Sequence, residues 1–331
     1  MIAHVEGEAS DTHLVFVYGT LRRGERNSHR LNHPTTKLVC EQSWIEDRAY
    51  RLVDTGNYPV LEVVQQKGID PMDNRIIGEV YRISSETLEE LDWLEGYDSS
   101  PSSSEEILYD RVRVRVESDN HKDKPLEALV YISSAFVNNS RLVKANDWKW
   151  HKFLLWHDSQ STSSTFLYFA YGSFMDDERL KEASVNDLFE PVGIAKVEGY
   201  RLAFTRKASD GGRADLVEDR ENRHAVEGVV YKCTSRALHY LIGREGAPRT
   251  YRPAYLQLSL QHPYNDNGKP LEQVSVLSFV VRDKDPRTEY KPIPTYAREI
   301  LRGARLRGLS PEYIDQLERH LERLGCAIPR F

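Results

Sequence analysis

Two segments of this sequence repeat one pattern, in which an apolar, aromatic run of strand character ends at a tyrosine, a glycine and a hydroxyl residue. The first runs from Leu14 to Leu21 (LVFVYGTL) and the second from Leu167 to Met175 (LYFAYGSFM). Such an ending can leave the next backbone N–H groups unpaired and aimed at one point, which suits a carboxylate or an oxyanion. A single copy is better explained as a buried strand with an ordinary glycine turn, so the repeat decides between these interpretations.

The remainder of the chain repeats in the same order. A short strand beginning at Gly78 (GEVY) has its counterpart at Gly228 (GVVY), and each precedes an amphipathic helix and a Glu-Gly pair. The distance from Gly78 to Glu95 is 17 positions, and the distance from Gly228 to Glu245 is also 17. This ordered agreement indicates a tandem duplication. The length of 331 residues fits it, because domains are typically about 150 residues long.

Local patterns predict the elements between these landmarks. Leucines at 88, 91 and 94 predict a helix over Ser84 to Leu94, and leucines at 238 and 241 predict one over Ser235 to Gly243. Each is closed by the glycine of its Glu-Gly pair. Alternating or apolar runs predict strands at 109–116, 129–132 and 251–258. Beyond the repeat, a Ser310 cap with Pro311 predicts two C-terminal helices joined at Gly308.

The domain boundaries follow from the repeat and from a serine-threonine stretch. We predict a first domain over 1–158, a linker over 159–165 and a second domain over 166–331. The tryptophans at 148, 150 and 156 are interpreted as packing residues at the end of the first domain or at a domain interface, and not as a ligand cage. The insertion from Ser99 to Ser104 is predicted to be a surface loop.

Composition excludes several classes of function. The net charge of -6 does not favour a nucleic-acid partner, and no apolar run approaches the roughly 20 residues that span a bilayer. The segment from Met1 to Asp11 is polar and acidic, so we expect no signal peptide. Cys40, Cys233 and Cys326 are too few and too scattered for a disulfide framework or a zinc site. We therefore expect a cytoplasmic protein without membrane partners or a metal.

The candidate chemistry is one glycine-hydroxyl turn and one glutamate in each copy. No Cys or His occurs at equivalent places in both halves, so a catalytic triad is not supported, and no phosphate-loop signature is present. A lone glutamate suits a reaction whose nucleophile is already inside the substrate, such as an amine that closes a five-membered ring on an acyl carbon. Orienting such partners lowers a barrier by roughly 7–11 kcal/mol, and a placed acid/base adds about 10²- to 10⁴-fold. The alternative for either glutamate alone is a surface residue at a helix end.

The combined motifs resemble those of the gamma-glutamylcyclotransferase-like superfamily over most of both halves. The first half is similar to the branch of gamma-glutamylamine cyclotransferase and plant avirulence-induced (AIG2-like) proteins, and the second to gamma-glutamylcyclotransferase proper. The matching segments of the first half are Val17-Tyr18-Gly19-Thr20-Leu21, Glu79-Val80-Tyr81, Leu91-Asp92-Trp93-Leu94-Glu95-Gly96-Tyr97 and Tyr109-Asp110-Arg111. Those of the second are Phe169-Ala170-Tyr171-Gly172-Ser173, Gly228-Val229-Val230-Tyr231, Arg244-Glu245-Gly246 and the tail from Pro294-Thr295-Tyr296 to Gly308-Leu309.

The resemblance implies an α+β fold of two tandem domains, each a small mixed β-barrel with flanking helices, and no metal or organic cofactor. Members of the family release 5-oxoproline and a free amine from a gamma-glutamyl amide. The resemblance carries the acid/base role to Glu95 and Glu245. It carries the binding of a small gamma-glutamyl substrate to two loops, whose residues are Tyr18, Gly19, Thr20 and Leu21 in the first half and Tyr171, Gly172, Ser173, Phe174 and Met175 in the second.

Two departures from the family pattern leave the substrate open. Phe174 follows the Gly-Ser where many members have asparagine, and Ile242 stands where the first copy has Asp92. The leaving amine, the oligomeric state and communication between the domains are not specified by these motifs. Two alternatives also stay open, namely a binding or regulatory protein that holds a glutamyl-like ligand without turnover, and a chain with one active and one regulatory domain.

Overall fold

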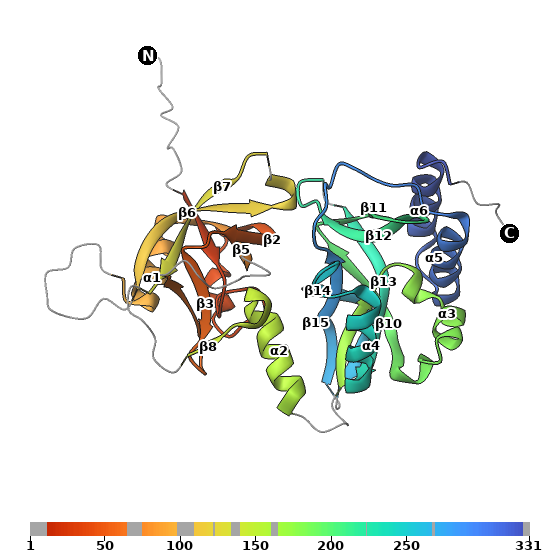
Figure 1. Ribbon diagram of the computed structural model, residues 1–331, viewed down its shortest axis with the longest axis horizontal. Helices are drawn as coiled ribbons and strands as arrows, with labels where there is room; N and C mark the ends of the chain where they lie inside the picture. Colours follow the sequence, from red (N-terminus) through yellow and green to blue (C-terminus); the bar gives the residue numbers. More distant parts are fainter. Residues whose placement is uncertain are drawn as a thin grey trace, which may run out of the picture. The chain divides into compact units, whose positions relative to one another are not determined.

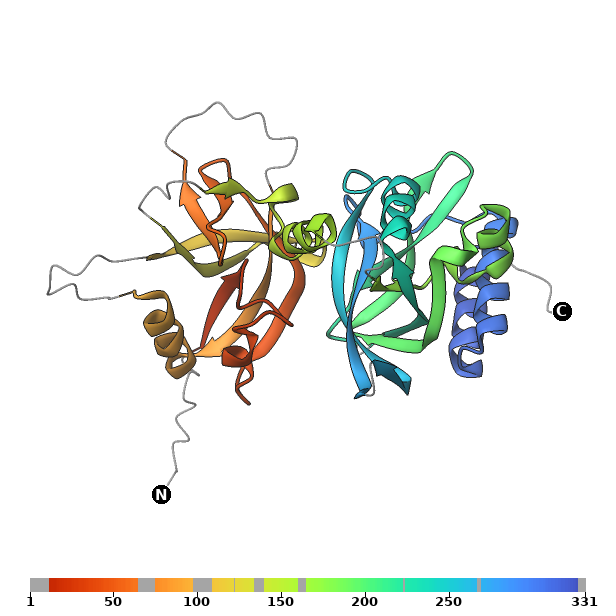
Figure 2. The same cartoon turned by 90° about the horizontal axis from the view of Figure 1, so that it is seen from below.

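The computed structural model describes residues 12–64, 75–97, 109–121, 123–133, 140–159, 165–222, 224–266 and 269–326 (Figures 1 and 2). The chain divides into two compact units, Met1–Lys152 and Phe153–Phe331, so the division falls within helix α2 (Trp148–Ser159). Of the predicted linker, residues 160–164 lie outside the described residues, as does the predicted loop from Ser99 to Ser104. Trp148 and Trp150 are buried, whereas Trp156 is half-exposed.

The first unit is built on a closed five-stranded barrel (Figure 1). Its strands, in order around the barrel, are β1 (Thr12–Val17), β5 (Arg75–Ser84), β2 (Lys37–Glu46), β6 (Asp110–Ser118) and β7 (Leu126–Ile132). Neighbouring strands run antiparallel except at the closing pair, where β7 runs parallel to β1 with Leu129 opposite Val15. Helix α1 (Ser85–Glu95) follows β5 directly.

The second unit repeats this barrel strand for strand. In the same order around the barrel, the strands are β9 (Thr165–Ala170), β13 (Ala225–Thr234), β10 (Phe189–Glu198), β14 (Tyr251–Asp266) and β15 (Lys269–Val281). The closing pair is again parallel, with Leu277 of β15 opposite Tyr168 of β9. Helix α4 (Ser235–Glu245) follows β13 as α1 follows β5. The duplication predicted from the sequence is therefore a duplication of the whole barrel topology.

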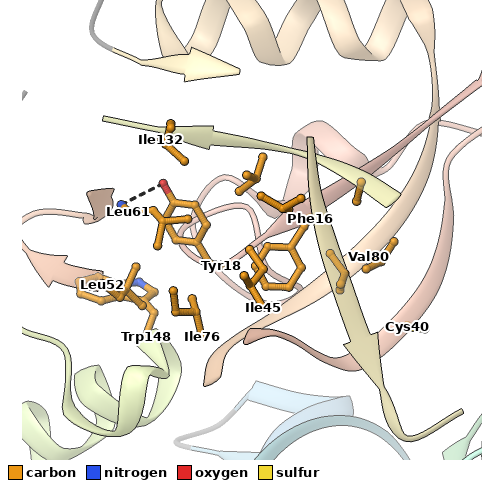
Figure 3. Close-up of a cluster of buried hydrophobic side chains, with 14 of the residues drawn as sticks. Phe16, Tyr18, Cys40, Ile45, Leu52, Leu61, Ile76, Val80, Ile132 and Trp148 are labelled. Atoms are coloured by element: carbon orange, nitrogen blue, oxygen red, sulfur yellow. Dashed lines mark hydrogen bonds between the residues drawn. The ribbon is translucent and has the colours of Figure 1, made fainter. Parts of the chain in front are cut away.

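A glycine at the start of each repeated strand motif makes room for a buried phenyl ring. A Cβ on Gly78 would lie 2.3 Å from Cζ of Phe16, and a Cβ on Gly228 would lie 2.7 Å from the ring of Phe169 and 2.3 Å from the Ala170 carbonyl oxygen. Real side chains cannot approach so closely. Figure 3 shows Phe16 among the buried side chains of the first barrel, beside Ile45 and Val80.

Each unit also carries a small sheet outside its barrel. In the first unit it contains β3 (Tyr50–Asp54), β4 (Pro59–Val63) and β8 (Arg141–Leu142), and in the second it is the hairpin of β11 (Tyr200–Ala208) and β12 (Gly211–Glu218). The pair β3–β4 and the pair β11–β12 are both inserted between the barrel strand that follows the tyrosine-glycine turn and the strand that leads into α1 or α4, whereas β8 follows β7. These sheets supply one wall of each cavity described below.

Three further helices belong to the second unit, namely α3 (Asp177–Glu182), α5 (Pro294–Arg307) and α6 (Pro311–Arg323). Gly308 ends α5 in a left-handed conformation with φ 76°, and the Ser310 hydroxyl accepts the Tyr313 N–H at 3.2 Å to cap α6. The two predicted C-terminal helices are thus confirmed. No helix within the described ranges is both long and apolar enough to cross a membrane.

Candidate active site

Both predicted acid/base residues stand at the same place, the last residue of an 11-residue helix. Helix α1 ends at Glu95 and helix α4 at Glu245, because the next residue is a glycine in the left-handed conformation, with φ 67° at Gly96 and 60° at Gly246. Ser84 caps the N-terminus of α1, its hydroxyl accepting the N–H of Thr87 at 3.3 Å. The sequence thus sets the two glutamates at equivalent positions beside their barrels.

The first unit has a cavity of about 280 Å³ that Glu95 shares with the tyrosine-glycine loop. All four predicted loop residues, Tyr18, Gly19, Thr20 and Leu21, line it. The remainder of its wall is mainly aromatic and apolar, and consists of Phe16, Val17, Arg26, Asn27, Tyr58, Pro59, Leu94, Tyr109 and Tyr131. The two predicted parts of the site, 76 positions apart in the sequence, meet in one cavity.

The second unit has the corresponding cavity, of about 210 Å³, between Glu245 and the second loop. Four predicted loop residues line it, namely Tyr171, Gly172, Ser173 and Phe174. Met175, also predicted to bind substrate, is not on the wall: it is buried against α5, where a Cβ on Gly303 would lie 2.9 Å from its own Cβ. The remainder of the wall consists of Tyr168, Arg179, Arg206, Arg213, Ala214, Arg244, Tyr251, Phe279 and Tyr296.

The loop residues that line the cavities include backbone N–H groups without a protein acceptor. In each loop the glycine carbonyl accepts an N–H three residues on, from Arg22 to Gly19 at 3.0 Å and from Met175 to Gly172 at 3.1 Å. Within the described residues, the N–H groups of the glycine and of the two residues after it donate to no protein acceptor in either loop. Clustered, unpaired N–H groups of this kind hold a carboxylate or a developing oxyanion.

The loop tyrosines contribute their rings to the cavity wall, while their hydroxyls form hydrogen bonds to a barrel strand. The Tyr18 hydroxyl donates to the carbonyl of Tyr131 at 2.9 Å, and the Tyr171 hydroxyl donates to the carbonyl of Phe279 at 2.6 Å. The Tyr18 oxygen also accepts the N–H of Leu61 at 3.4 Å, as Figure 3 shows. Both tyrosines therefore anchor the loop to the closing strand of the barrel.

Burial raises the pKa of both glutamates. It raises the pKa of Glu95 to about 7. Burial also raises the pKa of Glu245, while the guanidinium groups of Arg244, Arg206 and Arg179 act in the opposite direction. A carboxyl whose pKa lies near neutral pH can both accept and donate a proton under physiological conditions, as a general acid/base must.

A buried ionic network, not foreseen as a unit from the sequence, holds the first loop from behind. Glu79 is fully buried and accepts hydrogen bonds from Lys149 Nζ at 2.9 Å, Arg22 Nε at 3.2 Å and the Arg23 N–H at 2.8 Å. Burial by itself would raise the pKa of Glu79, but Lys149 and Arg22 hold it below its ordinary value. The repeated strand motif that contains Glu79 was the signal in the sequence that could have pointed to this network. The residues that bind Glu79, however, come from distant parts of the chain.

The second unit has a different buried carboxylate next to the residue that contacts its loop. Asp215, fully buried, accepts hydrogen bonds from Thr205 Oγ1 at 2.5 Å and the Val281 N–H at 2.8 Å, and pairs with Lys284 Nζ at 2.8 Å. Its neighbour Ala214 lies against the loop glycine. No spacing pattern marks this pair, because Asp215 and Lys284 are 69 positions apart.

Tyr109 and Tyr251 are wall residues that sequence reasoning did not select. Each stands at the start of the strand that follows the helix and its Glu-Gly pair, and each lines the cavity of its own unit. Their recurrence at the same place in both repeats was the signal that could have found them. Within the described ranges, no group of three or more His, Cys, Asp or Glu side chains is arranged to hold a metal ion.

The chain was compared with known proteins. A family model described as "Gamma-glutamyl cyclotransferase, AIG2-like" matches it over residues 15–150 and again over 168–296. "Putative gamma-glutamylcyclotransferase YkqA" of Bacillus subtilis (strain 168) is 32% identical over 314 residues, covering 94% of this chain and 98% of that protein. The crystal structure of YkqA matches with a TM-score of 0.72 over the same shares of the two chains. A gamma-glutamylcyclotransferase of Bos taurus is 29% identical over 160 residues, 46% of this chain and 77% of its own. These matches confirm the predicted family and its tandem arrangement.

Proposed function

Because the chain belongs to the gamma-glutamyl cyclotransferase, AIG2-like family, we propose that it converts a small gamma-glutamyl amide to 5-oxoproline and a free amine. The observation that carries this proposal is the pairing, made twice, of a partly buried glutamate with a loop of unpaired N–H groups across one small cavity. This arrangement provides one anion-binding element and one proton carrier, which is what an intramolecular acyl transfer requires.

In the proposed mechanism, the α-amine of the glutamyl group attacks its own γ-carbonyl carbon. The glutamate, Glu95 or Glu245, accepts a proton from the attacking nitrogen as the new C–N bond closes the five-membered ring. The loop N–H groups hold either the α-carboxylate or the oxyanion of the tetrahedral intermediate. When that intermediate collapses, the amide C–N bond breaks and the glutamate returns its proton to the departing amine. The reaction consumes no water and leaves the enzyme unchanged.

The raised pKa values of the glutamates support this role, because the same carboxyl must be a base in the first half of the reaction and an acid in the second. The tyrosine anchors support it too, since a fixed loop keeps the amine and the acyl carbon in attacking geometry. The three cysteines are free and buried, which supports a reducing, cytoplasmic location.

The test is release of 5-oxoproline from a panel of gamma-glutamyl amines by the full chain and by Glu95→Gln, Glu245→Gln and the double variant. We expect each single variant to lose the activity of its own unit, and the double variant to lose at least about 10²-fold. Glu89→Gln, an exposed glutamate on α1, is the matched control and should retain activity. Full activity of the double variant would show that these glutamates are not the acid/base groups. Tight calorimetric binding without product would favour the ligand-binding alternative.

A further inference from the structure

The carboxyl group of Glu95 depends on its helix for its position. Burial is the single cause that raises its pKa, and no hydrogen bond or charged neighbour within the described residues contributes to it. The place of this carboxyl beside the loop is therefore set by the last turn of α1, which carries it. That turn is held by three side chains, Asp92, Arg111 and Tyr131, which form the Asp92 cluster.

Asp92 stands three residues before Glu95, and its two carboxylate oxygens bind two different barrel strands. Tyr131 of β7 donates its hydroxyl to Asp92 Oδ1 at 2.7 Å, and Arg111 of β6 binds Asp92 Oδ2 through Nη1. Arg111 and Tyr131 are directly opposite each other on the two strands. The end of α1 is thus tied to the barrel by hydrogen bonds to an ionised group, which are stronger than those between neutral groups.

Arg111 also holds the chain on the far side of Glu95. Its guanidinium lies over the ring of Tyr97, 4.6 Å from the ring centroid. The N–H of Tyr97 in turn donates to the Asp92 carbonyl at 2.9 Å. The residues before and after Glu95 are therefore fixed by the same guanidinium.

Tyr131 connects the helix end to the candidate binding loop. Its backbone carbonyl accepts the hydroxyl of Tyr18, whereas its own hydroxyl donates to Asp92. Burial raises the pKa of the Tyr131 hydroxyl, and the carboxylate of Asp92 raises it further, so this hydroxyl remains a donor. One residue of the closing strand thus holds both parts of the first site.

The second unit has no polar side chain at any of the three equivalent positions, which are occupied by Ile242, Pro253 and Phe279. Ile242 follows the glycine of its strand motif by 14 residues, as Asp92 does. Pro253 and Phe279 are opposite each other on β14 and β15, as the other two members of the cluster are on β6 and β7. All three members are absent together, as expected of side chains that act as one unit.

The second glutamate is held in a different way. Arg244 Nε lies 3.5 Å from Glu245 Oε1, and Arg244 Nη1 donates to the Tyr240 hydroxyl at 3.2 Å. These three residues all belong to α4, so this carboxyl is held from its own helix. The first unit has Leu94 at the position of Arg244, and its helix is held from the barrel instead.

We infer that Asp92 and Tyr131 are positioning residues of the first site, which set the separation of Glu95 and the loop so that the glutamate reaches the reacting nitrogen. This inference rests on the proposed function for the identity of the reaction. Asp92 does not line the cavity, so it acts through Glu95 and not on the substrate. Without the cluster the helix end moves, which displaces Glu95 and admits water to its carboxyl.

The kinetic test uses Glu245→Gln, in which the first site alone keeps its acid/base residue, and the gamma-glutamyl amine of the panel that this variant cleaves fastest. Asp92→Asn and Tyr131→Phe should each lower kcat by about ten- to hundredfold, because a displacement of about 1 Å has effects of this size. KM should stay within about twofold, because the loop is unchanged. Phenylalanine fits at this place, since the second barrel has Phe279 there.

The double variant Asp92→Asn/Tyr131→Phe should lose little more than either single variant, because each substitution breaks the same link. Glu90→Gln is the matched control, since Glu90 is an exposed carboxylate on the same helix, and it should change neither kcat nor KM. Losses that multiply in the double variant, or an equal loss in Glu90→Gln, would overturn the inference.

The pKa of Glu95 separates this inference from the proposed function. The titratable or charged side chains that line the cavity beside Glu95 are Arg26, Tyr18, Tyr58, Tyr109 and Tyr131. Glu95 is therefore the one carboxyl group on the described wall, and a change in its pKa reports a change in its burial. Carbon-13 NMR follows this carboxyl, whose resonance is assigned by its loss in Glu95→Gln.

The parent should titrate at about 7. Tyr131→Phe removes no charge, yet it should lower the pKa of Glu95 by about one pH unit, and Asp92→Asn should do the same. Glu90→Gln should not change it. A lowered pKa supports the positioning role even if no protein form releases 5-oxoproline, which would by itself refute the cyclotransferase. An unchanged pKa in both variants would overturn the inference whatever the activity.

Discussion

The hydroxyl of Tyr18 donates a hydrogen bond to the carbonyl oxygen of Tyr131 at 2.9 Å, and it does so from the tyrosine that begins the candidate binding loop. The equivalent tyrosine of the second unit makes the equivalent bond, to Phe279 at 2.6 Å. Tyr131 and Phe279 each lie on the strand that closes their barrel. One hydrogen bond in each unit therefore ties the loop to the closing strand. The geometry of the candidate binding loop thus depends on a contact that involves no ligand.

Removal of that hydroxyl should loosen the loop. Tyr18→Phe leaves the Tyr131 carbonyl without this donor, so we expect a loss of about 1–2 kcal/mol in the free energy of unfolding and a higher KM at the first site. The measurements are denaturant unfolding and 5-oxoproline release in the Glu245→Gln background. Tyr50→Phe is the control, since Tyr50 lies on β3 of the same unit and does not line the cavity. Equal effects of the two substitutions would contradict the anchoring role.

The first site should show an acid limb near neutral pH. Burial raises the pKa of Glu95 to about 7, and the carboxylate form is needed to accept the first proton. In Glu245→Gln, kcat/KM should therefore fall about tenfold for each pH unit below 7. A profile that stays flat from pH 7 down to pH 5 would exclude Glu95 as the base.

The same carboxyl should make stability depend on pH. Burial raises the pKa of Glu95 from 4.5 to about 7, so folding favours its protonated form. That contribution is full below about pH 4.5 and is lost as the pH rises through about 7. Glu95→Gln, which stays neutral, should be more stable than the parent at pH 8 by on the order of 2 kcal/mol, and equally stable near pH 4. Thermal unfolding of both proteins at the two pH values is the measurement.

The second site should respond to the removal of a guanidinium. Arg206 acts to lower the pKa of Glu245, together with Arg244 and Arg179, against the effect of burial. Arg206→Gln should therefore raise that pKa and move the acid limb of kcat/KM to higher pH. The profile is recorded in the Glu95→Gln background, and Lys207→Gln should leave the limb where it is. A limb that moves to lower pH would contradict the electrostatic assignment.

The glycines that pack against a buried phenyl ring, Gly78 and Gly228, should tolerate no side chain. A Cβ on Gly228 would lie 2.3 Å from the Ala170 carbonyl oxygen, whereas a Cβ on Gly193, in the neighbouring strand, meets nothing within 4 Å. Gly228→Ala should cost about 1–3 kcal/mol of stability through forced displacement of the core, and Gly193→Ala should cost less than about 0.5 kcal/mol. Denaturant midpoints of the two variants compare them directly.

Much of the candidate site could be predicted because its parts are locally encoded. A strand that stops at Tyr18-Gly19 or Tyr171-Gly172, and a helix that ends at Glu95-Gly96 or Glu245-Gly246, each depend on a few neighbouring residues. Because the loop and the glutamate recur in the same order in both halves, they could be assigned to one site without knowledge of the fold. Met175, in contrast, is not on the wall of the cavity, because α5 covers it and a loop sequence does not reveal its covering helix.

The sequence by itself determined the duplication, the two loops, the two glutamates and the family, since all of these rest on local spacing that occurs twice. Only the tertiary structure decided which side chains share a cavity with each glutamate. Arg213 comes from β12 and Tyr58 from the turn before β4, and the lysines that pair with Glu79 and Asp215 are 70 and 69 positions away from them in the sequence. Charge at a site is a sum over residues that are distant in the chain and close in space, so it emerges only when the barrel closes.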